Sequence, residues 1–197
     1  MGALESLRSK LKPGKVYRRA ELASWSTAVD RHLKALLEDG TLKKMSPGLY
    51  HRAGRSVFGE VPPDDAELVR KFLKDDRFLI VSPNLYNALG VGTTQLYHSI
   101  VVYNHRRHGN FKLGGRFFSF RVKPRFPLKP GREFLLVDLL NNLGFLEEDR
   151  EAVLAKALMA ARSMDEMRLR RNLELYGSAS TRKIFGSHVW SGRDSSR

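Results

Sequence analysis

The residues that could do chemistry in this chain are few, and their spacing argues against catalysis. A nucleotidyltransferase needs a Gly-Ser turn followed by spaced carboxylates that hold magnesium against the phosphates. The stretches GSASTRK and GSHVWSGRD contain Gly-Ser without paired acids after it. No lysine has Asp or Glu two residues before it, as an acid-x-Lys nuclease would require, and the GxSxG pattern of serine hydrolases is absent. We therefore predict that the protein is not an enzyme and has no catalytic residue.

Metal binding has equally little support in the sequence. The run HRRH, His105 to His108, could supply two imidazole ligands, but it lies in an expected loop among arginines without an acidic neighbour. Phosphate contact or solvation is the better interpretation of these histidines. The chain contains no cysteine, which excludes disulfides, a thiolate nucleophile and a cysteine metal site. We predict no metal and no cofactor.

The charge of the chain predicts a polyanionic partner. The formal net charge is +14 and the isoelectric point is near 10.3. Residues 1–60 carry 12 basic and 6 acidic side chains, and residues 96–133 carry 9 basic and 1 acidic, whereas residues 61–95 are nearly neutral. Two basic regions favour nucleic acid as the partner, and the alternative is a basic surface that only keeps the protein soluble.

The first basic region contains a predicted recognition helix. An apolar stripe at helical spacing consists of Val29, Leu33, Leu36 and Leu37. Ser26 is a suitable N-cap and Gly40 suits the left-handed position after the last turn. The opposite face presents Thr27, Arg31 and Lys34 near the N-terminal half, where a recognition helix approaches the base edges of the major groove.

A hairpin is expected directly after this helix. The stretches TLKKM and LYHR suit two short strands, and SPG suits the turn between them. Short helices before the recognition helix and a hairpin after it give the order of a winged helix-turn-helix. Lys43 and Lys44 on the first strand and Arg52 on the second are then predicted to contact phosphates.

Two alternatives remain open in this region. Asp30 could accept a hydrogen bond from a cytosine amino group, or it could hold Arg31 or Lys34 in position. A winged helix can also serve protein contacts alone, so DNA binding is favoured by the charge and not by the fold.

The sequence after residue 60 predicts an α+β domain. The acidic, proline-containing stretch EVPPDD marks a boundary, so we expect a winged helix over residues 1–60, an α+β domain over 61–186 and a flexible tail over 187–197. Residues 95–126 suggest an antiparallel sheet, and helices should follow it to the C-terminus. A second basic surface is predicted from this sheet, with a polar outer sheet face as the alternative. It comprises Arg106, Arg107, Lys112, Arg116, Arg121, Lys123 and Arg125.

The stretches RFLIVSPNLYNALGVGTTQLYHSIVVYNHRRHG, FRVKPRFP and REFLLVDLLNNL resemble those of the bacterial AbiEi-like proteins. These are antitoxins and transcriptional regulators of type IV toxin-antitoxin systems. The resemblance covers residues 1 to about 160. It implies an N-terminal winged helix that binds inverted repeats in double-stranded DNA at its own promoter. It also implies a C-terminal domain that counteracts a nucleotidyltransferase toxin, with or without a direct complex. This chain ends soon after Phe185, and related proteins often have a longer C-terminal region.

The expected function is thus a DNA-binding repressor and antitoxin. The alternative is a protein or RNA interaction module in which bases or a partner stack on aromatic residues of the basic strands. Those aromatics are Tyr97, Tyr103, Phe111, Phe117 and Phe118. No apolar run approaches the length of a membrane span, and the start MGALESLRSK lacks the apolar core of a secretory signal. We therefore expect a cytoplasmic protein without a membrane partner.

Overall fold

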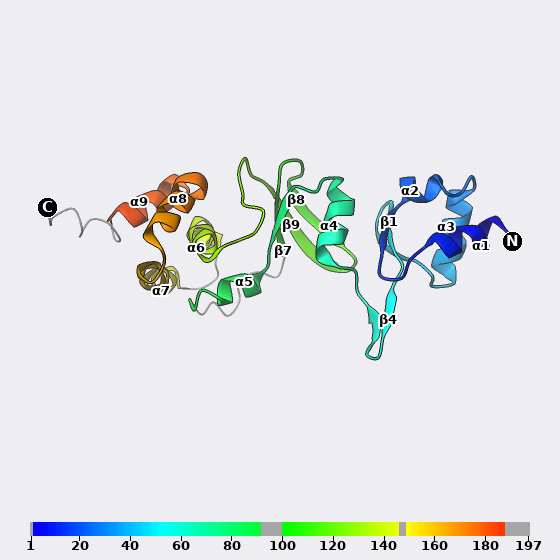
Figure 1. Cartoon of the computed structure of the whole chain (residues 1–197), viewed down its shortest axis with the longest axis horizontal. Coiled ribbons are helices and arrows are strands. Elements are labelled where there is room, and N and C mark those ends of the chain that lie inside the picture. The colour runs from blue at the N-terminus through cyan, green and yellow to red at the C-terminus, as the bar shows by residue number, and fades with distance from the viewer. Residues whose placement is uncertain (1, 92–99, 146–148, 188–197) are drawn as a thin grey trace. The chain divides into compact units, whose positions relative to one another are not determined.

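The computed structural model describes residues 2–91, 100–145 and 149–187. The chain divides into two compact units: unit 1 is Met1–Asp76 with Asn110–Phe118, and unit 2 is Arg77–Gly109 with Ser119–Arg197. Helices and antiparallel strands occur in both units (Figure 1), which confirms the predicted α+β class. Nearly all of the predicted tail, 187–197, lies outside the described residues.

Unit 1 begins with three helices and a small sheet. Its elements are α1 (Ala3–Lys10), β1 (Val16–Arg18), α2 (Arg19–Ala23), α3 (Val29–Glu38), β2 (Lys43–Ser46) and β3 (Leu49–His51). The strands are antiparallel in the order β1-β3-β2, with Val16 and Lys43 both opposite His51. Leucines from the helices, among them Leu7, Leu22 and Leu36, fill the core against this sheet.

The recognition-helix candidate α3 begins two residues later than its cap signal predicts. Ala28, not Ser26, is the N-cap, and its side chain caps nothing. The Ser26 hydroxyl instead accepts from the amide of Ala28 and hydrogen-bonds the Nδ1 of buried His32 at 2.7 Å. The predicted stop is confirmed, because Gly40 follows the C-cap Asp39 with φ 75°, a value that L side chains rarely adopt.

A second hairpin, absent from the sequence-based expectation, follows the first. It consists of β4 (Gly54–Ser56) and β5 (Gly59–Val61), paired antiparallel as an isolated two-stranded sheet. Each strand has only three residues and no apolar alternation, so the usual sequence signals of a strand are weak here. In Figure 1 this hairpin extends away from the helices of unit 1.

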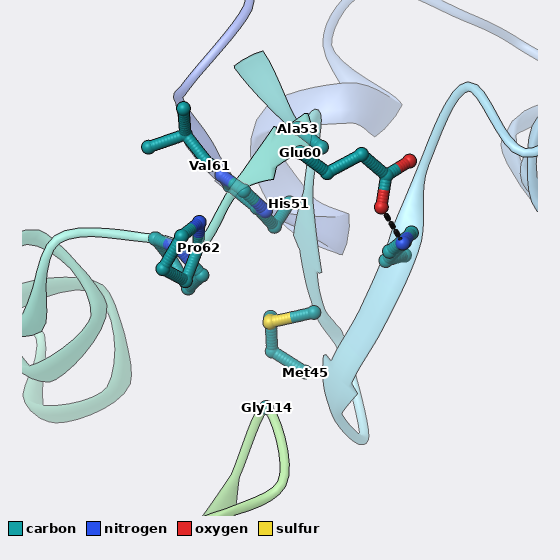
Figure 2. Close-up of a pocket in the computed structure, with 9 residues that line it drawn as sticks. Met45, His51, Ala53, Glu60, Val61, Pro62 and Gly114 are labelled. Atoms are coloured by element: carbon teal, nitrogen blue, oxygen red, sulfur yellow. Dashed lines mark hydrogen bonds and ion pairs between the residues drawn. The ribbon is translucent and has the colours of Figure 1, made fainter. Parts of the chain in front are cut away.

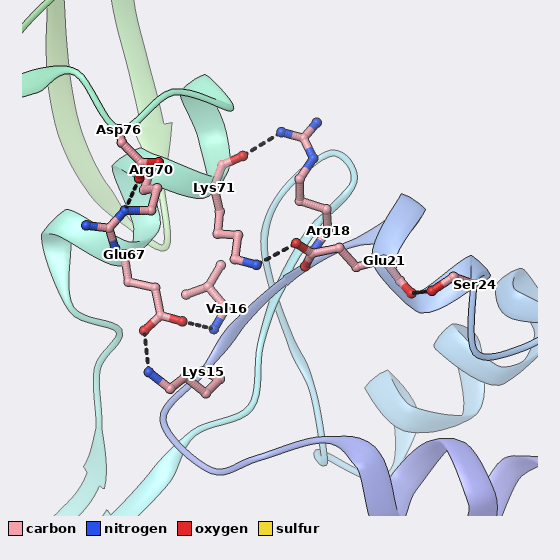
Figure 3. Close-up of polar contacts among 9 residues, drawn as sticks. All are labelled: Lys15, Val16, Arg18, Glu21, Ser24, Glu67, Arg70, Lys71 and Asp76. Atoms are coloured by element: carbon pink, nitrogen blue, oxygen red, sulfur yellow. Dashed lines mark hydrogen bonds and ion pairs between the residues drawn. The ribbon is translucent and has the colours of Figure 1, made fainter.

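Helix α4 (Asp65–Leu73) belongs to unit 1, which differs from the expected boundary at residue 60. Glu67 accepts hydrogen bonds from the amide of Val16 at 3.1 Å and from the ammonium of Lys15 at 3.4 Å (Figure 3). Lys71 pairs with Glu21 of α2 at 2.5 Å. These polar contacts attach α4 to β1 and α2, so the proline-rich stretch before it is a turn within the unit.

Unit 2 combines most of a second sheet with a group of helices. The sheet contains β6 (Phe78–Val81), β7 (Ile100–Asn104), β8 (Gly109–Leu113) and β9 (Arg116–Val122) in the order β6-β7-β9-β8. Residues 110–118, which form the β8–β9 turn and its flanks, are counted with unit 1. The helices are α5 (Pro83–Asn87), α6 (Arg132–Asn141), α7 (Arg150–Arg162), α8 (Glu166–Tyr176) and α9 (Ala179–Phe185), with a 3-10 turn η1 (Leu143–Phe145). Among the described residues, no helix has the length and apolar character needed to cross a membrane.

Helix α6 lies at the centre of unit 2 and carries a buried carboxylate. Six of its apolar residues are buried in the largest core cluster, in the run 134–140 that also contains Asp138. Asp138 is 2% exposed and accepts hydrogen bonds from the hydroxyls of Tyr86 and Tyr103, the latter at 2.7 Å. Asn142 donates to the Tyr103 oxygen and accepts from Arg121. Burial raises the pKa of Asp138 and of Tyr103.

Candidate nucleic-acid interface

The exposed face of α3 carries two of the predicted DNA contacts. Arg31 and Lys34 are three residues apart, so they lie on the same face of the helix, and both are exposed. Among the described residues, the ion pair of Lys34 is a long one, with Glu38 at 3.9 Å on the solvent side. Thr27 is exposed too, but it lies in the turn before α3 and not on the helix, which corrects its predicted position.

Asp30 has a partner that the sequence did not suggest. Its two carboxylate oxygens accept from the Arg19 guanidinium at 2.7 and 2.6 Å, a bidentate pair across 11 residues. These hydrogen bonds from Arg19 lower the pKa of Asp30. Asp30 therefore holds Arg19 at the start of α2, and neither Arg31 nor Lys34. Arg19 is a basic residue of this face that sequence analysis missed, although the Arg18-Arg19 pair before a short helix was a visible signal.

The two lysines of β2 have different environments. Successive side chains of a strand point to opposite faces, so Lys43 and Lys44 do not share a face. Lys44 is exposed and has no ion pair within the part of the chain that the structure describes. Lys43 instead pairs with Glu60 of β5, and this hydrogen bond lowers the pKa of Glu60. The predicted phosphate contact of Lys43 therefore competes with an ion pair inside unit 1, whereas that of Lys44 does not.

A pocket of about 230 Å³ lies beside the Lys43–Glu60 pair, between β2 and β5 (Figure 2). Its walls are mainly apolar, with Met45, Val61 and Pro62 among them. Buried His51 also contributes to the lining, and its Nε2 has no hydrogen-bond partner among the described residues. Burial lowers the pKa of His51 and so disfavours the charged imidazolium.

Arg52 has structural partners within unit 1. Its guanidinium is half-buried and donates to the backbone carbonyls of Arg8, at 3.3 Å, and of Leu11. These carbonyls end α1, where helices leave acceptors without an intrahelical partner. The Arg52 side chain therefore caps a helix, and its predicted phosphate contact would have to compete with these hydrogen bonds.

The seven residues of the predicted second basic surface divide between the units. Lys112 and Arg116 belong to unit 1, whereas the other five belong to unit 2. The predicted single surface is therefore not present within either unit. Arg106 and Arg107 are exposed in the turn after β7, where the Asn104 side chain accepts from both of their amides. Arg125 is also exposed.

The remaining members of this set have structural contacts. Arg116 pairs with Asp65 at 2.5 Å and donates to the carbonyl of Pro63, within unit 1. Arg121 donates to Asn142 at 2.6 Å and so joins the network around Asp138. The ammonium groups of two lysines lie over aromatic rings, Lys112 over Phe117 and Lys123 over Tyr103.

The aromatic residues proposed for stacking in the alternative module are mostly unsuited to that role. Tyr103 and Phe118 are buried, and Phe111 packs edge-on against Phe72 at 5.1 Å. Phe117 is 55% exposed, and Tyr97 lies outside the described residues. The expected row of stacking residues on the basic strands is therefore not present in the described structure.

Comparison with protein-family models, with curated proteins and with solved structures returned no match to this chain. Among the described residues, His, Asp and Glu side chains form no group of three or more that could hold a metal ion. The candidate site is therefore described by charge and exposure alone, and Arg19, Arg31, Lys34 and Lys44 are its exposed basic residues on α2, α3 and β2.

Proposed function

We propose that unit 1 is a winged helix that binds double-stranded DNA, with α3 as its recognition helix. The observation that carries the proposal is the exposed pair Arg31 and Lys34 on α3, directly before a hairpin that carries exposed Lys44. The order of elements, α1-β1-α2-α3-β2-β3, with a hairpin after the last helix, supports this proposal. A net charge of +14 supports a polyanionic ligand.

Within this proposal, the basic residues have distinct roles. Arg31 and Lys34 approach the major groove from the N-terminal half of α3. Lys44 contacts a backbone phosphate from β2. Arg19, held by the bidentate contact with Asp30, contacts a phosphate at the N-terminal end of α2. Because Asp30 is occupied by Arg19, it does not read cytosine in this arrangement.

We further propose that the DNA target is the protein's own promoter and that the protein acts as the antitoxin of a type IV toxin-antitoxin system. This proposal derives from the resemblance of the stretches around residues 77–109, 120–127 and 132–143 to AbiEi-like proteins. Unit 2 contains all three stretches and is the part assigned to counteracting the nucleotidyltransferase toxin. Within the proposal, the exposed arginines of the 105–108 turn and Arg125 are the candidate contact residues of unit 2.

The experiment that tests sequence-specific binding compares two duplexes by fluorescence anisotropy. One is the fragment upstream of the protein's reading frame, and the other is a scrambled duplex of equal length and composition. We expect the promoter fragment to bind at least about a thousandfold more tightly at physiological salt, as specific regulators do. Equal affinity for both duplexes would contradict the repressor proposal.

The antitoxin proposal needs a separate test in cells. Expression of the neighbouring reading frame should arrest growth, and co-expression of this protein should restore it. The matched control is a variant with Arg31, Lys34 and Lys44 replaced by alanine, which should lose promoter binding and still restore growth if unit 2 neutralises. A neighbouring frame that encodes no nucleotidyltransferase would reduce the proposal to a DNA-binding regulator.

A further inference from the structure

The β4–β5 hairpin presents two apolar side chains to solvent at its tip. Val57 is 93% exposed and Phe58 is 98% exposed, the two highest values for large hydrophobic residues in the described structure. The flanking strands have three residues each, so the tip extends roughly 10 Å beyond the hairpin base at about 3.4 Å per residue. An exposed apolar pair at a protruding tip costs solubility and so favours a binding role.

The backbone of the tip is held in one conformation. The amide of Phe58 donates to the Ser56 hydroxyl at 3.2 Å, and that hydroxyl donates to the Gly59 carbonyl at 3.1 Å. Gly59 has φ 108°, which a residue with a Cβ would adopt only under strain. Because these contacts restrict the backbone of the turn, the entropy cost of binding falls mainly on the side chains of Val57 and Phe58.

The base of the hairpin is attached to β2 through Lys43, whose side chain lies on the other face of the strand from Lys44. Glu60 of β5 pairs with Lys43 of β2, the strand that also carries Lys44. Glu60 is opposite Arg55 in the hairpin register, and the charge of Arg55 adds to that of Lys43 in lowering the pKa of Glu60. The single acid of the hairpin is thus offset by two cations, so the tip can approach phosphates without net repulsion.

The size of the tip distinguishes between possible partners. A valine and a phenylalanine together offer roughly 300 Å² of apolar surface. A stable protein interface buries about 800 Å² on each partner, so the tip alone is too small for a dimer contact. The minor groove is about 7.5 Å deep, and apolar wedges such as Phe and Leu insert there between base steps.

From these observations we propose that the β4–β5 hairpin inserts Phe58 between base pairs of the DNA from the minor groove, with Val57 against the sugar edge. This inference rests on the proposed DNA binding by unit 1. It adds a contact made by an apolar side chain, which stacks on bases and carries no charge. The wedge therefore contributes affinity that does not depend on salt, unlike the contacts of Lys44 and Arg31.

The test uses duplexes tiled across the upstream fragment, each with 2-aminopurine in place of successive adenines. This base fluoresces when it is unstacked. We expect the full-length protein to raise the fluorescence several-fold at one or two adjacent positions. Phe58→Ser should abolish that rise and weaken binding about tenfold, in line with the loss of one base–aromatic stack, without a change in salt dependence. Phe58→Leu should retain most of the rise.

Control experiments distinguish a failure of the Phe58 wedge from a failure of the proposed DNA binding by unit 1. Met167→Ser changes an exposed apolar residue of α8 in unit 2 and should leave both affinity and fluorescence unchanged. Wild-type protein that binds the duplexes without unstacking any base would overturn the wedge and leave DNA binding intact. Wild-type protein that binds none of them would overturn both. If Phe58→Ser instead dissociates an oligomer in sedimentation experiments while DNA binding is unchanged, the tip is a protein contact and the wedge is overturned.

Discussion

Arg31, Lys34 and Lys44 of unit 1 are exposed on α3 and β2, whereas Asp138 of unit 2 is buried within hydrogen bonds from two tyrosines. The first group leaves its charge available to a ligand in solution. The Asp138 carboxyl group instead connects α6 with α5 and β7 inside unit 2. We infer that exposure of a charged group to solvent is the better guide to a ligand contact in this molecule, since the partners of Asp138 lie inside its own unit.

Replacement of Asp138 by alanine should have the largest effect on stability. The substitution leaves the hydroxyls of Tyr86 and Tyr103 buried without their acceptor and opens a cavity in the core. We expect a loss of about 3 kcal/mol in the free energy of unfolding, measured with urea. Glu174→Ala, on the exposed surface of the same unit, is the matched control and should change stability by less than about 0.5 kcal/mol.

The pH dependence of stability at Asp138 provides a second test of the comparison between buried and exposed charges. Burial raises the pKa of Asp138 above its unfolded value, so the folded state binds the proton more tightly. The contribution of Asp138 to stability is therefore fully present below a pH of about 4 and declines as the pH rises through the folded pKa. The difference in unfolding free energy between wild type and Asp138→Asn should fall as pH increases. A difference that rises with pH would show that Asp138 is stabilised as a carboxylate.

The exposed group should affect DNA binding and not stability. Alanine at Lys44 should weaken binding to every duplex and lower the slope of log affinity against log salt by about 0.9, the value for one phosphate that is no longer neutralised. Alanine at Arg31 and Lys34 together should weaken binding to the promoter duplex more than binding to a scrambled duplex. Lys43→Ala is the matched control, and we expect an unchanged slope because Lys43 pairs with Glu60. An equal reduction by Lys43→Ala would mean that this ion pair opens on DNA.

Replacement of Arg52 should have the smallest effect of these substitutions. It should lower stability, whereas replacement of Lys44 should weaken DNA binding. Arg52→Ala removes the donor to the carbonyls at the end of α1, so the free energy of unfolding should fall by about 1 kcal/mol. The salt dependence of DNA binding should not change. Thermal unfolding and anisotropy on the same preparation measure both quantities. Unchanged stability together with a reduced salt dependence of DNA binding would instead show that Arg52 contacts DNA.

Local signals in the sequence predicted much of the fold and less of the site. The end of α3 at Gly40 and the β2–β3 hairpin depend on neighbouring residues, and both were predicted. Lys43 meets Glu60 from 17 residues away and Arg52 meets Leu11 from 41 residues away. Such pairings depend on the tertiary structure, which periodicity does not describe. The Asp138 network was missed because its members come from four separate segments of unit 2.

The proposal that unit 1, and not unit 2, binds DNA is tested most directly by NMR chemical-shift mapping. The full-length protein is titrated with the promoter duplex. Amide resonances of residues 27–38 and of Lys43 and Lys44 should shift most, and those around Asp138 should stay in place. We expect the turn at residues 105–108 to move little. Shifts centred on that turn or on the rest of unit 2, with α3 unaffected, would contradict the assignment of DNA binding to unit 1.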